Sequence, residues 1–117
     1  MMVDYRRLQF EMDEVNNLPH FWSFRLNKDS LYRDGDWRHY VWIGLSPTGH
    51  IVFLRYPEEY PYGFFSVEVE PDIQTKYKHS LRELCYIRGY EWNPSFTVVS
   101  IIPVIFKFLQ DYSKGRI

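Results

Sequence analysis

The chain has few of the residues from which metal and cofactor sites are built. It contains one cysteine, Cys85, so no disulfide can form within its 117 residues. Its four histidines, at positions 20, 39, 50 and 79, have no metal-ligand spacing with that cysteine. The six glycines are scattered and form no phosphate-binding fingerprint. The sequence therefore predicts no metal, no ATP site and no cofactor.

An excess of one charge and a long apolar run are also missing. Fourteen basic and fifteen acidic residues leave a net charge of -1, which argues against nucleic acid as a partner. The longest apolar run, residues 96–109, is broken by Pro103 and Lys107 and is shorter than the about twenty residues of a membrane span. The first residues have no apolar signal-peptide core. We expect a soluble, cytoplasmic protein that does not bind membranes.

Aromatic residues are abundant, at 20% of the chain, with ten Tyr, nine Phe and four Trp. The core must therefore be built largely from rings. There is no internal repeat or low-complexity tract, and the length suits one hydrophobic core. The sequence predicts a single domain over residues 1–117.

A helix is predicted over residues 3–17, with Asp4 near its start and Pro19 marking its end. Apolar side chains recur there at helical spacing, at Tyr5, Leu8, Met12 and Val15. Charged side chains fall largely between them, at Arg6, Arg7, Glu11 and Glu14. The pattern is that of an amphipathic helix with a polar outer face.

Four strands are predicted next, over residues 21–27, 39–45, 50–56 and 64–70, from alternating or β-branched and aromatic runs. The turn "SPTG" between the second and third predicts a hairpin. We expect an antiparallel meander with one face covered by both helices. The side chains expected on that face are Trp22, Phe24, Val41, Ile43, Phe65, Val67 and Val69.

Periodicity fades over residues 73–93, which predicts an irregular loop that carries Cys85. A second helix is predicted over residues 97–112, capped by Ser95 or Thr97, with Pro103 kinking it or shifting its start. The fold class is α+β: an N-terminal helix, a four-stranded antiparallel meander, an irregular cysteine loop and a C-terminal helix.

Several motifs in this order resemble ubiquitin-conjugating enzymes. The stretch "VFLRYPEEYPYGFFSVEVEP" is similar to the family's strand, Tyr-Pro turn and strand. His79, Cys85 and Trp92-Asn93-Pro94 follow as the family's histidine, active cysteine and Trp-x-Pro turn do. The chain thus looks like a short, prokaryotic-type member of the UBC-like superfamily. Such members often accompany ubiquitin-like or CBASS-type antiviral signalling genes.

Two features depart from the family pattern. The motif His-Pro-Asn is absent, because Ser80 and Leu81 follow His79, so the asparagine that stabilises the oxyanion is missing. Gly63 and Phe64 stand where the family usually has a Pro-Pro pair.

The resemblance implies that Cys85 is the nucleophile of a transferase. It would accept the C-terminus of a ubiquitin-like protein as a thioester from a separate activating enzyme and pass it to an amine of a protein substrate. Arg82, Arg88 and His79 lie near enough in sequence to favour the thiolate. The alternative for Cys85 is a small buried hydrophobic residue.

For His79 two roles stay open, ordering the cysteine loop and acting as general base. In place of the missing asparagine, His79 or backbone amides are favoured as oxyanion donors over Asn93. Trp92 and Pro94 suit packing and turn roles.

The resemblance also implies two partner-binding surfaces. Tyr62, Trp92, Pro94 and Ser95 match the region where ligase partners dock. Arg6 and Arg7 match basic residues that meet an acidic activating enzyme, the alternative being a solvated helix face.

A non-catalytic adaptor, of the kind formed by variant UBC and RWD-type domains, is the rival function, and the missing asparagine favours it. The position of Cys85 distinguishes the two. A thiol open to solvent beside His79 favours the carrier, whereas a thiol buried under Trp92 and Phe96 favours the adaptor.

Overall fold

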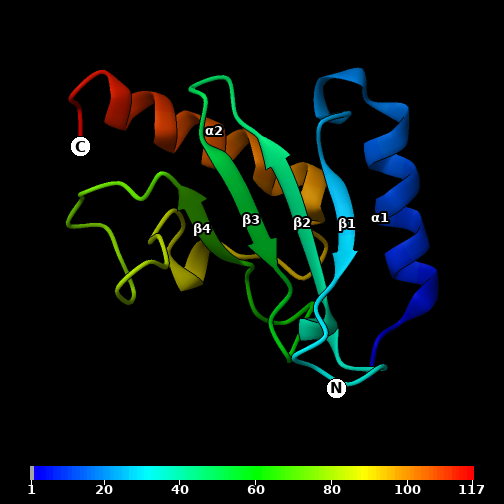
Figure 1. The fold of residues 1–117 in the computed structure, drawn as a ribbon. Helices are drawn as coiled ribbons and strands as arrows, with labels where there is room; N and C mark the ends of the chain where they lie inside the picture. The colour runs from blue at the N-terminus through cyan, green and yellow to red at the C-terminus, as the bar shows by residue number, and fades with distance from the viewer. Residues whose placement is uncertain (1) are drawn as a thin grey trace.

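Two helices flank one four-stranded sheet in the computed structural model, which describes residues 2–117 (Figure 1). The elements follow in the order α1 (Tyr5–Asn17), β1 (Arg25–Lys28), β2 (Tyr40–Leu45), β3 (Ile51–Arg55), β4 (Ser66–Glu70) and α2 (Val98–Ser113). The strands lie side by side in sequence order and each neighbouring pair is antiparallel. The predicted α+β class and the antiparallel meander are confirmed.

Helix α1 begins at Tyr5, directly after Asp4, the residue predicted to lie near its start. The Asp4 carboxylate accepts hydrogen bonds from the backbone N–H of Arg6 at 3.0 Å and Arg7 at 3.4 Å, which satisfies two of the free donors of the first turn. Leu8 and Val15 are buried, as their spacing predicts. Glu11 is not on a polar outer face: it is fully buried, and Tyr5 is exposed instead.

The inner face of the sheet, which α2 covers, differs from the predicted one in strand β2. Phe65, Val67 and Val69 are buried there, as is Phe24. Val41 and Ile43, however, lie on the opposite, outer face, since the register pairs them with Arg55 and Phe53 while Trp42 pairs with Leu54. The inner positions of β2 are Tyr40, Trp42 and Gly44. Trp22 precedes β1 and is 57% exposed.

The reason for this difference is that β2 is apolar on both faces, so the alternation of its side chains does not show which face is buried in the core. Packing against other side chains determines which face points inward. The indole N–H of Trp42 donates to the buried hydroxyl of Tyr56 at 2.9 Å, which requires both rings inside. Gly44 lies under the ring of Phe24, with so little space that a Cβ atom at Gly44 would meet the ring at 2.5 Å.

Helix α2 runs without interruption from Val98 through Pro103 to Ser113, with Thr97 as its N-cap residue. The hydroxyl of Ser100 accepts from the N–H of Thr97 at 3.1 Å. Pro103 is exposed and neither starts nor ends the helix. The buried side of α2 is formed by Val98, Ile101, Ile102, Ile105 and Leu109. α2 crosses behind the sheet, and α1 lies beside β1 and contacts α2 (Figure 1).

The core is built around aromatic rings, as the composition predicts. Tyr60 has ring centroids of Trp37, Tyr56 and Phe65 at 4.8, 4.7 and 5.1 Å. All four side chains are buried, and this cluster lies where α1, the turn after β3 and the start of α2 meet. Among residues 2–117, neither helix has the length and apolar character needed to cross a membrane.

Candidate functional site

The segment that carries Cys85 is attached along the outer edge of β4 (Figure 1). Three alternate carbonyls of this strand region accept hydrogen bonds from it: Phe65 from the hydroxyl of Tyr86 at 2.8 Å, Val67 from the N–H of Leu84 at 2.8 Å, and Val69 from the guanidinium of Arg82 at 3.4 Å. The segment has no helix or strand longer than a turn, as predicted, but it is firmly anchored.

Cys85 itself is held by a small backbone ladder. Lys78 pairs with Leu84, the N–H of His79 donates to the carbonyl of Glu83 at 2.9 Å, and the N–H of Cys85 donates to the carbonyl of Tyr77 at 2.8 Å. The Lys78 ammonium bonds the Asp72 carboxylate at 3.0 Å and lowers the pKa of that group. The position of the thiol is thereby fixed by main-chain contacts on both sides.

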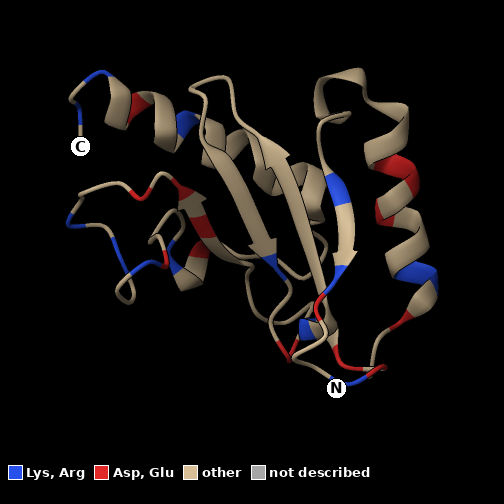
Figure 2. Cartoon of the chain, viewed as in Figure 1, with Lys and Arg blue, Asp and Glu red and all other residues tan. Residues whose placement is uncertain are grey.

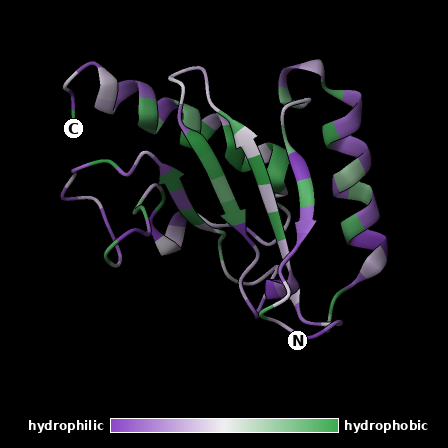
Figure 3. Cartoon of the chain, in the orientation of Figure 1, coloured by the Kyte–Doolittle hydropathy of each residue, from purple (hydrophilic) through white to green (hydrophobic). Residues whose placement is uncertain are grey.

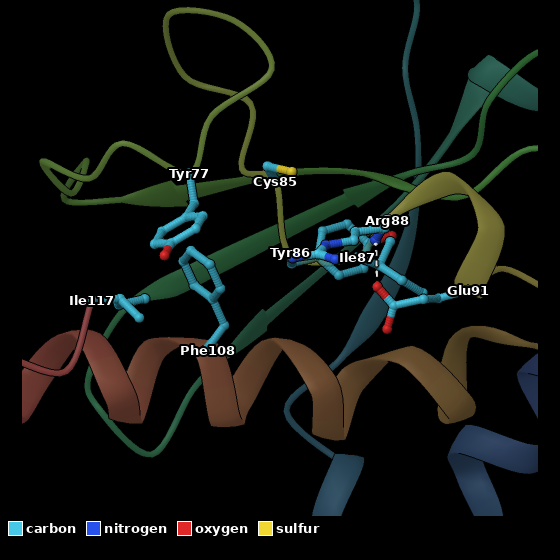
Figure 4. Close-up of a pocket in the computed structure, with 8 residues that line it drawn as sticks. All are labelled: Tyr77, Cys85, Tyr86, Ile87, Arg88, Glu91, Phe108 and Ile117. Carbon is cyan, nitrogen blue, oxygen red and sulfur yellow. Dashed lines mark hydrogen bonds between the residues drawn. The ribbon is translucent and has the colours of Figure 1, made fainter.

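The thiol lines a surface pocket of about 220 Å³ (Figure 4). The walls are Tyr77, Tyr86, Ile87, Arg88, Glu91, Phe108 and Ile117. Tyr77 and Phe108 meet edge to face, with centroids 6.3 Å apart, and join the cysteine segment to α2. Cys85 is half-buried. It is neither covered by Trp92 and Phe96 nor placed in a groove with His79, so its surroundings match neither of the two predicted arrangements.

Of the cations near Cys85 in sequence, Arg88 is the one that lines the pocket. Its guanidinium donates to the hydroxyl of Tyr90 at 2.8 Å, and this bond, with the charges of Tyr90 and Glu91 and a smaller contribution from Cys85, raises the pKa of Arg88. Arg82 turns away, toward Glu70 and the carbonyl of Val69. Arg88 is thus the group that can offer positive charge to the sulfur.

His79 is exposed, and its ring lies tilted against that of Phe64, with centroids 5.6 Å apart. It is not among the side chains that line the Cys85 pocket. The N–H of His79 bonds the carbonyl of Glu83, but this is a main-chain contact, so a loop-ordering role of the imidazole stays a prediction.

Trp92 joins the two turns that the resemblance assigns to ligase docking. Its indole N–H donates to the carbonyl of Pro61 at 2.8 Å, and its ring packs against Tyr60 and Phe96. Tyr62 is 67% exposed beside Pro61. Pro94 and Ser95 are exposed at the other turn.

The amide oxygen of Asn93 accepts from the N–H and the hydroxyl of Ser95, each at 2.8 Å. This is an Asx turn that leads into α2, and it gives Asn93 a structural role.

The two arginines of α1 have different surroundings. Arg6 is exposed. The guanidinium of Arg7 points inward: it donates to the carbonyl of Phe96 at 2.6 Å and to the hydroxyl of Tyr60 at 3.2 Å, and lies 3.6 Å from the carboxylate of Glu11. The structure therefore corrects the expected location of Arg7, which binds the core rather than forming a free basic pair with Arg6.

Glu11 is a buried acid that the sequence pattern placed outside. Its carboxylate accepts from the N–H of Val98, the first residue of α2, at 2.7 Å, and from the hydroxyl of Tyr60 at 2.8 Å. Burial raises the pKa of Glu11 to about 7, although both hydrogen bonds and Arg7 favour the charged form. The sequence contains one sign that Glu11 has a partner: Arg7 lies four residues before it, which is the spacing of ion pairs on a helix.

Within residues 2–117, no cluster of three or more His, Cys, Asp and Glu side chains is arranged to hold a metal ion. The pocket residues Tyr77, Ile87 and Phe108 were not recognised from the sequence. Phe108 alone had a signal, because it follows Ile101 and Ile105 at helical spacing. Comparison with models of known protein families gave no match, and neither did comparison with curated proteins.

Proposed function

We propose that this chain is a short ubiquitin-conjugating-like carrier that holds a ubiquitin-like protein as a thioester on Cys85. The observation that carries the proposal is the placement of the lone thiol: it lines a pocket, half-exposed, on an irregular segment tied to β4 on one side and α2 on the other. A cysteine kept only to fill the core would lie among the apolar side chains of the sheet.

The proposed reaction has two balanced acyl transfers. The Cys85 thiolate attacks the thioester carbonyl of the charged activating enzyme, a new sulfur–carbon bond forms, and the enzyme's own cysteine leaves as a thiolate. An amine of the protein substrate then attacks the Cys85 thioester, the carbon–nitrogen bond forms, and the Cys85 thiolate leaves. The amine proton passes to solvent.

Positive charge for the first step comes from Arg88 on the pocket wall. In the second step negative charge develops on the carbonyl oxygen. Because neither His79 nor an asparagine lines the pocket with Cys85, backbone amides of the loop are the proposed donors. Arg6 is the exposed cation of α1 that remains for the activating enzyme. Tyr62, Pro94 and Ser95, connected through Trp92, form the proposed ligase-facing surface.

The test combines this chain with a ubiquitin-like protein, an activating enzyme that charges it, and ATP. An adduct that reducing agent removes is expected for the wild type, none for Cys85→Ala, and a thiol-resistant ester for Cys85→Ser. Discharge to free lysine is then followed separately. His79→Ala and Asn93→Ala should both charge and discharge as wild type, because neither side chain lines the pocket with Cys85. A wild type that forms no adduct while the activating enzyme itself is charged refutes the carrier.

An adaptor is the second candidate, because no Asn, Gln or His side chain lines the pocket with Cys85 to act as a neutral oxyanion donor. In that case the chain binds the ubiquitin-like protein without a covalent bond. Titration calorimetry should then give equal affinities for the wild type and Cys85→Ala, and no adduct should form.

A further inference from the structure

The outer face of the sheet, opposite α2, has an apolar centre. Four side chains of the two middle strands form it, here called the outer patch: Ile43, Leu45, Ile51 and Phe53. Leu45 is 54% exposed and Ile51 40% exposed. The solvent face of an antiparallel sheet is ordinarily polar, and a contiguous apolar patch marks an interaction site. Figure 3 shows the hydrophobic colouring of the two middle strands.

Opposite charges border the outer patch on the two edge strands. The register places four residues in one row across the sheet, in the order Arg25, Ile43, Phe53 and Glu68. Glu70 continues the acidic side, paired with Ile51 in the next row. Figure 2 shows this layout, with blue on β1, red on β4, and uncharged middle strands down to Arg55 at the end of β3.

Arg25 and Glu68 are both exposed, and in the described part of the chain neither forms an ion pair. Three strand spacings separate them, about 14 Å, so they are too far apart to pair with each other in one molecule. The guanidinium of Arg25 bonds only the carbonyls of Trp22 and Phe24. Each of the two charges is thus free for a partner of opposite sign.

We propose that the outer face binds a second copy of this chain. The two copies face each other across a two-fold axis. This axis lies between the two outer faces, runs parallel to the strands and passes over the line between β2 and β3. It places β1 of each copy above β4 of its partner. Because Arg25 and Glu68 share a row, this operation brings each Arg25 to the partner's Glu68, twice per dimer. The same operation stacks the outer patches of the two copies against each other.

The expected dimer is weak. The four strands span about 19 Å and five residues of strand about 17 Å, which gives roughly 300 Å² of flat face per copy. Standard interfaces bury about 800 Å² per partner. One end of the face is also occupied, since the ion pair of Asp29 with Arg55 brings the loop after β1 over it. We therefore expect a dimer that forms only at high protein concentration.

Sedimentation velocity on the full chain between 10 μM and 2 mM tests the proposal. The wild type should dimerise over this range, and Phe53→Glu should stay monomeric. Arg25→Glu and Glu68→Arg should each weaken the dimer about 10-fold or more, because each puts like charges together at two places.

Mixing these two variants is the decisive measurement. In the mixed pair every contact is again between opposite charges, so a heterodimer should form where neither variant self-associates. The double exchange Arg25→Glu/Glu68→Arg should restore the homodimer. Arg6→Glu, which reverses the same charge on α1, should dimerise as wild type. Circular dichroism shows that each variant is folded.

A wild type that remains monomeric at 2 mM overturns the proposal and leaves a different protein as the partner of this face. A dimer that the charge reversals do not weaken also overturns it, because the contact then lies elsewhere.

Discussion

The hydroxyl of Tyr60 donates a hydrogen bond to the carboxylate of Glu11 at 2.8 Å, across 49 positions of sequence. The other oxygen of Glu11 accepts from the first N–H of α2 at 2.7 Å. One acid therefore joins α1, the turn after β3 and the start of α2, and it satisfies a helix donor that would otherwise be buried without a partner.

Glu11→Ala should lower the free energy of unfolding by about 3 kcal/mol, because it leaves the N–H of Val98 without its acceptor in the interior and removes the carboxylate beside the Arg7 guanidinium. Glu11→Gln should cost less than about 1 kcal/mol at pH 7. Its amide oxygen can accept from Val98, and the Tyr60 hydroxyl can turn to the carbonyl of Phe96, 3.3 Å away. Urea unfolding measures both. Equal losses for the two variants would contradict this account.

The raised pKa of Glu11 makes stability depend on pH. The folded chain holds the Glu11 proton up to about pH 7, whereas the unfolded chain releases it near 4.5. Between these values the folded state binds more protons, so stability should fall as pH rises, by about 3 kcal/mol in total. Above about pH 7 the folded chain has released this proton too, and the stability that it contributed is fully lost.

Glu11→Gln should remove this fall, whereas Asp13→Asn, an exposed change on the same helix, should keep it. Urea midpoints at pH 5, 6, 7 and 8 measure the slope. A Glu11→Gln variant with the wild-type slope would assign the pH dependence to another group.

Gly44→Ala should destabilise the chain by about 1–3 kcal/mol, since the added Cβ would meet the Phe24 ring at 2.5 Å and force the ring or the strand to move. Gly89→Ala is the matched control: a Cβ there meets nothing within 4 Å. It should change stability by less than about 0.5 kcal/mol. Thermal unfolding measures both, and a neutral Gly44→Ala would show that the Phe24 ring has room to shift.

Arg88→Gln should slow alkylation of Cys85 by iodoacetamide about 2- to 5-fold at pH 7, because it removes a positive charge from the wall of the pocket that the reacting sulfur lines. Arg82→Gln removes a neighbouring cation that points toward Glu70 and should leave the rate unchanged. Stopped-time mass spectrometry measures the rates. The same slowing in both variants would indicate a general effect of net charge instead.

Trp92→Phe should lower the free energy of unfolding by about 1–2 kcal/mol. It keeps an aromatic ring against Tyr60 but removes the N–H that donates to the carbonyl of Pro61. Tyr90→Phe serves as the control on an exposed ring and should change stability by less than about 0.5 kcal/mol. Guanidinium unfolding compares them, and a Trp92→Phe variant as stable as wild type would mean that water replaces the bond.

Patterns of local spacing predicted most of this fold correctly. The buried positions of Leu8 and Val15 on α1 and of Val67 and Val69 on β4 follow from rules that act over a few residues, and the structure has them as predicted. The N-cap of α2 is Thr97, one of the two predicted candidates. β2 was assigned to the wrong face because Tyr40, Val41, Trp42 and Ile43 are all apolar. Its two faces are distinguished by contacts with other segments, Trp42 with Tyr56 and Gly44 with Phe24.

The candidate site shows the same division. Cys85 and its irregular segment could be predicted from the sequence, since both are local features. The inward direction of Arg7 could not, because its acceptors Tyr60 and Phe96 lie 53 and 89 positions away. The sequence also could not show that Arg88, and not Arg82, lines the Cys85 pocket, because this depends on how the cysteine segment is anchored to β4. Contacts between distant segments decide which of several similar side chains reaches a site.

The cysteine segment occupies the outer edge of β4, because it bonds the carbonyls of Phe65, Val67 and Val69. A strand from another molecule cannot be added there without first detaching the segment that holds Cys85, so this edge of the sheet is closed to the strand pairing through which apolar strands aggregate.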